Sequence, residues 1–481
     1  MLEILVLLIY LAAMFAIGFY FKGKIQNTED YYLSSRSLPL PVVTLTFAAS
    51  FIGAALTMGQ AGLAYNEGLM AVTLNITAIL ALFIFSFLSP RIREVGAKYN
   101  VSSIPDLFYK RFGKTTSLVA AVLVLWTLVA VVGSQMVASS TILELICKPW
   151  GVSYEVAVFI SVIIVVVYTM MSGLYGVAYT DVVQGLLLIL FIGIMLPILC
   201  LNSAGGLGNL RATLPANYFS FKPNMMIIGF MFVDLLYFLS APPYWQRTLA
   251  AKSSGVARGG IARATIIILF YALMVSLIGM SAAVIFPNIP AGYSSEEALI
   301  PLMVRATFHP LVSALVISAI MAVLMSTIDS YLINAAQTVI TDIYAVVKKD
   351  VTDEEQLRMA KWVVVILGFG AAIFALYFRQ ILTAIYFAFT FFSSALSIPT
   401  LATLLWRKAT KAGVLSGIFT GFVSSIVWSN VLGNPFDLHQ AIPAGILCGI
   451  VTVGVSLYTY NPETAAPYFE VDLRNSGEHA S

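Results

Sequence analysis

Thirteen apolar stretches separated by short polar segments run through this chain of 481 residues, and they constrain its fold more than any other feature. A helix crosses a lipid bilayer with about 20 consecutive apolar residues. Hydrophobic residues make up 60% of the chain and charged residues 10%, whereas soluble domains hold about 45–50% and about 25%. The sequence therefore predicts an all-α polytopic membrane protein and excludes a soluble enzyme, a nucleic-acid-binding protein and a disordered chain.

The predicted spans cover most of the chain. The segment over 308–346 is too long for one simple span, so we expect a tilted helix or one that extends beyond the bilayer. The first stretch lacks a basic leader and a cleavage site, and we interpret it as a retained span. The thirteen spans are predicted at about 2–21, 40–66, 69–89, 115–147, 154–171, 176–202, 224–246, 262–287, 308–346, 357–378, 381–405, 412–433 and 439–460.

The distribution of Lys and Arg predicts the orientation. If the N-terminus lies outside and the chain crosses thirteen times, 21 of the 26 Lys and Arg residues fall on the cytoplasmic side. Cytoplasmic loops of membrane proteins carry this excess, and an even number of spans would break it partway along the chain. We therefore expect an integral protein of the plasma (inner) membrane with its C-terminus in the cytoplasm.

Several motifs that would supply another source of energy or chemistry are missing from the sequence. There is no G-x-x-x-x-G-K-[ST] phosphate loop and no H-E-x-x-H zinc motif, and Cys147, Cys200 and Cys448 have no metal-ligand spacing. We expect a protein that is not an enzyme and that uses an ion gradient or forms a passive pore. Its expected partners are a small-molecule solute and the lipid bilayer, with no nucleic acid and no obligatory protein partner evident.

Two predicted spans are interrupted. Small residues cluster around Gly53, Gly59 and Gly62 in the second span, and Pro242-Pro243 stands near the inner end of the seventh. Interrupted helices are costly in lipid, and Pro-Pro removes two amide donors. Because the two spans lie five apart, they fit an inverted repeat of spans 2–6 and 7–11. Close glycine packing and a simple proline kink are the alternatives.

Three carboxylates fall inside predicted spans: Asp181, Asp234 and Asp329. A carboxylate in lipid needs a partner, a cavity or a cation. No Lys or Arg lies deep in any predicted span, so a cation from solution is the natural partner, and a bound proton is the alternative.

Hydroxyl side chains flank one of these carboxylates. Ser326, Thr327 and Ser330 lie in the same turn as Asp329. Oxygen ligands, some of them backbone carbonyls, suit a hard cation such as Na⁺. Ordinary hydrogen bonding of Ser and Thr to the preceding helical turn is the alternative.

Six segments, taken in order, resemble the sodium:solute symporter family, and the likeness covers nearly the whole chain. The resemblance implies a LeuT-type 5+5 inverted repeat with one extra N-terminal and two extra C-terminal helices, about thirteen spans in all. The segments are Gly59-Gln60-Ala61-Gly62-Leu63-Ala64-Tyr65; Ser103-Ile104-Pro105-Asp106 through Arg111-Phe112-Gly113; Ser172-Gly173-Leu174 leading to Thr180-Asp181-Val182-Val183-Gln184-Gly185; Gln246-Arg247 with Leu249-Ala250-Ala251-Lys252-Ser253; Met325-Ser326-Thr327-Ile328-Asp329-Ser330; and Leu405-Trp406-Arg407-Lys408-Ala409-Thr410-Lys411 with Gly413.

The resemblance also implies a Na⁺ site between the first broken helix and the long helix of the second repeat. Carried onto this sequence, the site uses backbone carbonyls of Ala49, Ile52 and Val323 and the hydroxyls of Ser326 and Thr327.

Some members of the family hold a second cation nearby. The matching residues here are Asp181, Ser326, Asp329 and Ser330. Members with that site can carry a serine at the position of Asp329, so the extra carboxylate either tightens the site or holds a proton.

The solute pocket that the resemblance implies lies between the broken helices. Its lining is more apolar than a sugar carrier needs, because each sugar hydroxyl requires a polar partner. A carboxylate could instead be held by a half-helix N-terminus, and Asp234 could select an amine. The matching positions are Phe51, Gly53, Leu56, Thr57, Gln60, Asn75, Gln135, Phe238 and Ser240.

The expected function is secondary active transport by alternating access, with inward Na⁺ movement driving uptake of a small organic solute, an organic acid or amino acid rather than a sugar. A proton-coupled carrier that uses Asp181 and Asp329 is the alternative, and a transporter-like sensor is a remote one. The chain is divided into a leading span and first cytoplasmic loop (1–39), two five-helix repeats (40–202 and 203–406), two trailing spans (407–460) and a cytoplasmic tail (461–481).

Overall fold

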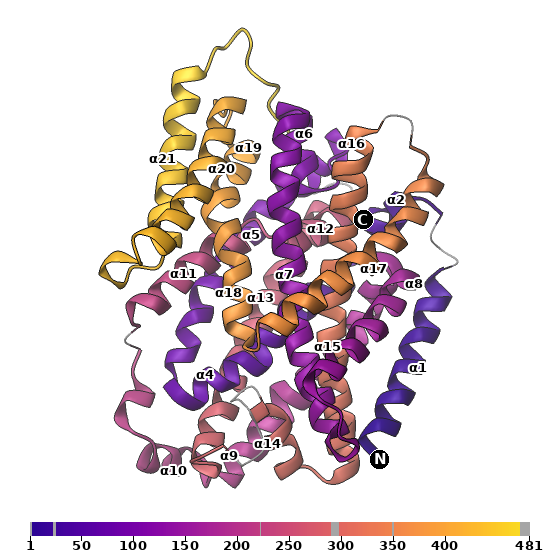
Figure 1. Cartoon of the computed structure of the whole chain (residues 1–481), viewed down its shortest axis with the longest axis vertical. Helices are drawn as coiled ribbons and strands as arrows, with labels where there is room; N and C mark the ends of the chain where they lie inside the picture. Colours follow the sequence, from indigo (N-terminus) through magenta and orange to yellow (C-terminus); the bar gives the residue numbers. More distant parts are fainter. Residues whose placement is uncertain (1, 23–25, 222, 290–297, 349–350, 472–481) are drawn as a thin grey trace.

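The chain folds into a bundle of helices, most of which run along its long axis (Figure 1). The computed structural model describes residues 2–22, 26–221, 223–289, 298–348 and 351–471; of the predicted cytoplasmic tail, residues 472–481 lie outside this range. The only strand-like pairing among the described residues is an isolated bridge between Leu38 and Ala251. The prediction of an all-α membrane protein is confirmed.

All thirteen predicted spans coincide with helices, but not all of these helices pass as membrane spans on their own. Within the described ranges, ten helices are long and apolar enough, and the bent pair Leu40–Phe51 and Ala55–Glu67 makes an eleventh. The apolar helices Leu2–Ile17 and Tyr154–Met170 are shorter. The count of thirteen therefore stays a prediction.

The first predicted repeat contains both short and very long helices. Gly173 adopts φ 53° and ψ −175°, a conformation that favours glycine, and it divides α8 into the segments predicted as spans five and six. The α-helices from the N-terminus to Thr213 are α1 (Leu2–Lys22), α2 (Thr28–Leu33), α3 (Leu40–Phe51), α4 (Gln60–Glu67), α5 (Met70–Tyr99), α6 (Ile104–Phe112), α7 (Lys114–Cys147), α8 (Tyr154–Leu188), α9 (Leu196–Ser203) and α10 (Gly206–Thr213).

The remaining helices continue the same bundle. The long predicted segment over 308–346 is a single continuous rod, formed by α15, a π-helical turn and α16. The elements are α11 (Met225–Phe238), α12 (Pro242–Ala250), α13 (Ser254–Ile285), α14 (Leu299–Thr307), α15 (Pro310–Gln337), the π-helical turn Thr338–Tyr344, α16 (Ala345–Val347), α17 (Asp353–Tyr377), α18 (Ile381–Phe392), α19 (Ile398–Leu405), α20 (Lys411–Ile426) and α21 (Ala441–Thr459).

Helix α15 forms the centre of the bundle. Its most apolar 18-residue window is 83% buried inside the protein, compared with 33% for α17, α20 and α21. It packs against α1, α3, α7, α8 and α17. The outer helices expose large apolar side chains such as Ile266, Ile366 and Ile373, which is expected where lipid covers the surface.

Both predicted interruptions are present. The first broken span bends by 60° between α3 and the helix that starts at Ala55. The second is broken between α11 and α12, and Pro242 and Pro243 occupy the first turn of α12. Prolines are tolerated there because the first amides of a helix have no helical acceptor. The prolines therefore start the second half-helix instead of kinking a continuous one.

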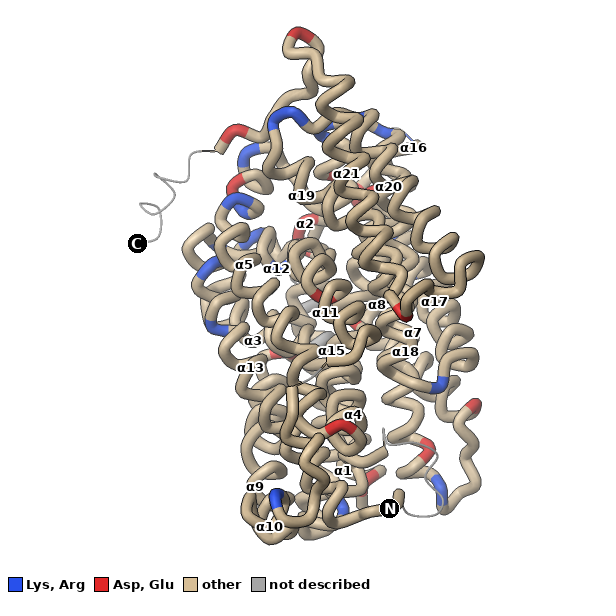
Figure 2. The backbone as a smooth tube through the Cα atoms, turned by 90° about the vertical axis from the view of Figure 1, so that its left-hand side faces the viewer, with Lys and Arg blue, Asp and Glu red and all other residues tan. Residues whose placement is uncertain are grey.

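Lys and Arg residues gather at one end of the bundle (Figure 2). Figure 2 shows Lys and Arg concentrated around α16 and the nearby end of α5, and few of them at the opposite end, where α9 and α10 lie. This asymmetry is the one on which the predicted orientation rests. Lys24, Lys222, Lys349 and Arg474, which the orientation count includes, lie outside the described residues.

Candidate functional site

A cavity of about 60 Å³ lies in the middle of the bundle beside both helix breaks. Aromatic and aliphatic side chains from both predicted repeats form most of its wall, and, besides the tyrosines, polar side chains reach it from α3, α4, α5, α7, α11 and α15. The lining residues are Ser50, Phe51, Gly53, Ala55, Leu56, Gln60, Leu74, Asn75, Ala78, Val131, Gln135, Asp234, Phe238, Tyr244, Thr327, Tyr331, Leu382, Ile385, Tyr386 and Phe389.

Seven of the nine predicted solute-contacting residues line this central cavity. The other two are turned toward protein partners: Thr57 forms a hydrogen bond of 3.1 Å with the Tyr271 hydroxyl, and Ser240 one of 2.8 Å with Ser397. The seven are Phe51, Gly53, Leu56, Gln60, Asn75, Gln135 and Phe238.

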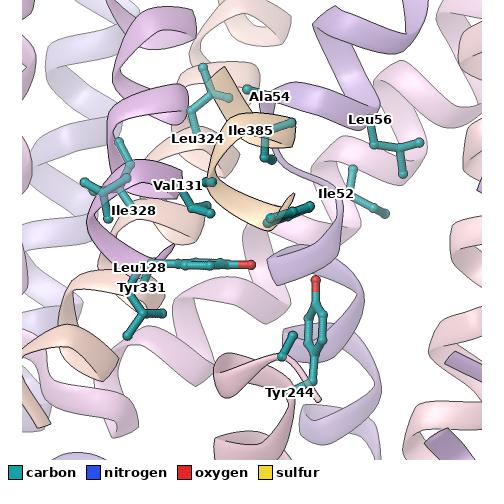
Figure 3. Packing of buried hydrophobic residues seen from close by; sticks show 14 of the residues in the cluster. Ile52, Ala54, Leu56, Leu128, Val131, Tyr244, Leu324, Ile328, Tyr331 and Ile385 are labelled. Atoms are coloured by element: carbon teal, nitrogen blue, oxygen red, sulfur yellow. The ribbon is translucent and has the colours of Figure 1, made fainter. Parts of the chain in front are cut away.

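The sequence does not indicate which way the Asp234 side chain faces, and it does not single out the other aromatic residues of the cavity. The structure brings Asp234, Tyr244, Tyr331, Tyr386 and Phe389 to the cavity wall. In Figure 3 the hydroxyls of Tyr244 and Tyr331 point toward one another near the unwound segment at Ile52. An isolated aromatic residue in an apolar span carries no sequence signal for its facing.

The amide side chains at the cavity are already engaged with the protein. Gln60 Nε2 donates to Ser276 Oγ at 2.8 Å and to the Ala71 carbonyl at 2.9 Å, while Gln60 Oε1 accepts from Asn75 Nδ2 at 2.8 Å. Gln135 Oε1 accepts from the backbone N–H of Ala54 at 2.7 Å. Gly53 permits this close approach, since a Cβ at residue 53 would lie 2.8 Å from Gln135 Oε1.

The break in the first broken span releases backbone carbonyls. In an unbroken helix the N–H groups of Gly53 and Ala54 would bond the carbonyls of Ala49 and Ser50. Here Gly53 N donates to the Phe51 carbonyl at 2.8 Å, and Ala54 N donates to Gln135. Ile52 has ψ 68°, which turns its carbonyl away from the helix axis. The carbonyls of Ala49 and Ile52 are two of the predicted Na⁺ ligands.

The remaining predicted ligands lie on α15. Val323, Ser326 and Thr327 are buried, and Thr327 Oγ1 donates to the Val323 carbonyl at 3.2 Å. Thr327 also reaches the wall of the central cavity, as does Ser50 of α3. The five predicted donors thus come from two helices that pack against each other. Carbonyl and hydroxyl oxygens are the donor set that a hard monovalent cation requires.

Asp181 connects the two sides of the predicted Na⁺ cage. Its Oδ1 accepts a hydrogen bond from Ser326 of α15, and its Oδ2 accepts one from Thr46 of α3. One buried carboxylate of α8 therefore holds together the helix that breaks and the helix that carries the hydroxyls.

The expectation that no basic residue lies deep in the spans is wrong. Arg247, on α12, is fully buried, and its Nη2 lies 3.5 Å from Asp181 Oδ2. The same guanidinium donates to Ser330 Oγ at 2.6 Å and to Thr46 Oγ1 at 3.1 Å. The predicted seventh span ended at residue 246, whereas the broken helix continues to Ala250. Asp181 thus has a resident cationic partner.

Of the four residues predicted for a second cation, three meet around this guanidinium. Asp181, Ser326 and Ser330 are joined through Arg247 and through their own hydrogen bonds. Asp329 has a different partner: its Oδ1 accepts from Thr169 of α8, and its buried Oδ2 has no hydrogen-bond partner.

Larger cavities lie on either side of the central one. One, of about 510 Å³, shares Leu74, Leu382 and Tyr386 with it and extends to the end of the bundle with few basic residues. Another, of about 500 Å³, lies near α2 and α6 at the basic end. Transporters built from inverted repeats bind their solute near the middle of the membrane, at the interface between the repeats.

The two broken helices, the central cavity and the predicted oxygen cage are features of a cation-coupled secondary transporter. The chain belongs to the sodium:solute symporter family, whose family model matches residues 31–421. It is 27% identical over 476 residues to the osmoregulated proline transporter OpuE of Bacillus subtilis, covering 95% of each chain. It is also 27% identical to the sodium/proline symporter of Escherichia coli, covering 95% of this chain and 93% of that one.

A solved structure of a Na⁺-coupled sialic acid symporter has the same fold. The TM-score is 0.81 at 20% identity, and the match covers 98% of this chain and 99% of the other. Na⁺ is therefore the coupling ion of the family to which this LeuT-type chain belongs, and the relatives are transporters and not enzymes.

Proposed function

We propose that this protein couples inward Na⁺ movement to the uptake of a compact organic solute, an amino acid or organic acid rather than a sugar. The observation that carries the proposal is the position of the first helix break. It releases the Ala49 carbonyl and turns the Ile52 carbonyl outward, on the helix that packs against Ser326 and Thr327.

Coupling follows from differential affinity. A Na⁺ ion in the cage joins the broken helix of one repeat to α15 of the other, so it stabilises the state in which these helices are close together. Because Thr327 belongs to the cage and to the cavity wall, the ion and the solute stabilise the same arrangement. The membrane potential adds about 2.3 kcal/mol to the driving force for Na⁺ entry, per charge and for every 100 mV.

The lining of the central cavity supports a solute with few hydroxyl groups. The side-chain amides of Gln60 and Asn75 are bonded to each other and to the protein, and aromatic rings form much of the rest. A sugar would leave hydroxyls without partners, at a cost of roughly 1–3 kcal/mol each. The names of the similar proline transporters point to the same choice.

A proton-coupled carrier is the second candidate, and the buried Oδ2 of Asp329, which has no hydrogen-bond partner, favours it. That oxygen could carry a proton that is exchanged during transport.

Thermal unfolding of the purified protein tests both candidates. A ligand that binds only the folded state raises the midpoint of unfolding. We expect Na⁺ to raise it relative to K⁺, a solute from a panel of amino acids, organic acids and sugars to raise it further, and Ser326→Ala to need a higher Na⁺ concentration for the same rise. If saturating Na⁺ has no effect on the wild-type protein, the Na⁺ proposal is wrong and proton coupling becomes the leading candidate.

A further inference from the structure

Among the described residues that line the central cavity, one is a carboxylate and none is basic. Asp234 lies on α11, close to the second helix break, and is 5% exposed. Its Oδ2 accepts a hydrogen bond of 2.9 Å from the Tyr386 hydroxyl. Within the described part of the chain, the ion pairs involve other carboxylates. A buried carboxylate without a cationic partner is costly in the membrane interior unless a ligand supplies the positive charge.

Aromatic rings surround the space beside this carboxylate. The ring centroids of Phe51 and Phe238 lie 4.8 Å apart, and those of Phe238 and Phe389 lie 5.8 Å apart. Tyr386, which holds Asp234, lies next to Phe389 with a centroid separation of 6.4 Å. Aromatic faces attract cations through their quadrupole, most strongly where water is excluded. A carboxylate beside such rings is a site for an ammonium group with apolar substituents.

The cavity offers fewer groups that could bind an anion than groups that could bind an ammonium ion. Helix α12 begins with Pro242 and Pro243, which have no N–H to offer, and the N–H groups of Tyr244 and Trp245 donate to the Ala241 carbonyl. The Ala54 N–H, at the start of the other half-helix, is taken by Gln135. Arg247 is bound to Asp181, Ser330 and Thr46. An organic acid without an amine would meet the Asp234 carboxylate and no basic side chain among the described residues of the cavity wall.

We propose that Asp234 is a specificity-determining residue that binds the protonated amine of the transported solute. The proposal rests on the proposed transport function and narrows it from organic acids and amino acids to compact solutes that carry an ammonium group. Tyr386 acts as a positioning residue, because its hydroxyl fixes one carboxylate oxygen and leaves the other for the solute.

Three probes of similar size show which charged group of the solute the site recognises. Proline carries an ammonium and a carboxylate, pyrrolidine only the ammonium, and cyclopentanecarboxylate only the carboxylate. In saturating Na⁺, we expect the wild-type protein to be stabilised against heat by proline or pyrrolidine and not by cyclopentanecarboxylate. Stabilisation by cyclopentanecarboxylate equal to that by the amines would overturn the proposal, as would the failure of both amines.

Asp234→Asn keeps the shape of the side chain and removes its charge. We expect the midpoint shift with Na⁺ alone to stay as in the wild-type protein, and the concentration of the stabilising amine for half-maximal shift to rise at least about tenfold, which is about 1.4 kcal/mol. Glu155→Gln is the matched control, because this exposed carboxylate pairs with Arg379 at the protein surface. Unchanged amine binding in Asp234→Asn contradicts the role of Asp234.

Tyr386→Phe keeps the test decisive if Asp234→Asn does not fold. Loss of the hydroxyl frees Asp234, so a smaller rise in the same half-saturating concentration is expected, with the Na⁺ shift retained. Unchanged amine affinity in Tyr386→Phe overturns its positioning role. If Na⁺ has no effect on any variant but amines still bind through Asp234, the Na⁺-coupling proposal fails and the amine site stands.

Discussion

Arg247 and Asp181 form an ion pair inside the membrane-spanning bundle, with 3.5 Å between Nη2 and Oδ2 and neither side chain exposed. Arg247 also donates to Thr46 of α3 and Ser330 of α15. One guanidinium therefore connects four helices, two from each predicted repeat. Any motion of one repeat against the other has to rearrange these bonds or carry them along.

Removing either member of this pair should destabilise the protein strongly. A buried charge left without its partner costs about 3–5 kcal/mol. We expect Arg247→Gln and Asp181→Asn each to lower the midpoint of thermal unfolding well below that of Arg379→Gln, which breaks an exposed pair with Glu155. The midpoint of the double variant should fall by less than the sum of the decreases in the two single variants. Equal midpoints for Arg247→Gln and Arg379→Gln would contradict the importance of the buried pair.

Ser326→Ala and Thr327→Ala test the Na⁺ cage. Each removes one of five predicted oxygen ligands, so we expect the Na⁺ concentration for half-maximal uptake to rise about tenfold with little change in the amount of folded protein. Ser318→Ala is the matched control on the same helix, because its buried hydroxyl donates only to the preceding turn, to the Ala314 carbonyl at 2.8 Å. If both cage variants keep the wild-type Na⁺ dependence, the ion does not bind here.

Asp329→Asn distinguishes two roles of Asp329, the binding of a proton and the binding of a second cation. Asp329 is bonded to Thr169, and its other oxygen has no partner. We expect the Asn variant to keep its half-saturating Na⁺ concentration within about twofold of the wild-type value, because a neutral amide replaces a protonated acid at little electrostatic cost. Uptake measured across a Na⁺ series at two pH values checks this. A lower Hill coefficient for Na⁺ in the variant would instead place Asp329 at a second cation site.

The helix breaks could be predicted because their causes are local. Gly53 and the Pro242-Pro243 pair disturb the backbone by their own chemistry, and the structure unwinds at those points. Of the cavity residues on α3, α5 and α7, Phe51, Asn75 and Gln135 followed from the family likeness.

The buried guanidinium could not be predicted from its own segment. Arg247 follows the polar residue Gln246 at the end of an apolar run, which resembles a span boundary in any hydropathy window. Its burial depends on Asp181 and Ser330, which are far away in the sequence. The facing of Asp234 was hidden for a related reason: one polar residue in a uniformly apolar helix sets no periodic pattern.

Arg111 belongs to one of the segments that carry the family likeness, but its structural role could be seen only in the folded protein. It lies on the short helix α6, and its guanidinium donates to the carbonyls of Thr403, Trp406 and Arg407 at the end of α19, the latter two at 2.8 and 3.0 Å. Burial lowers the pKa of Arg111 to about 10, so it stays charged at neutral pH. Cations that bond the last carbonyls of a helix stabilise its C-terminus.

We expect Arg111→Lys to lower the midpoint of thermal unfolding although the charge is kept. A lysine ammonium is a compact point charge and cannot span three carbonyls as the planar guanidinium does. Each carbonyl left unpaired in a buried position costs about 1–3 kcal/mol. Arg407→Lys is the control, because Arg407 is 69% exposed and pairs with the exposed Glu470. A midpoint for Arg111→Lys equal to that of Arg407→Lys would show that the guanidinium fork does not hold α6 to α19.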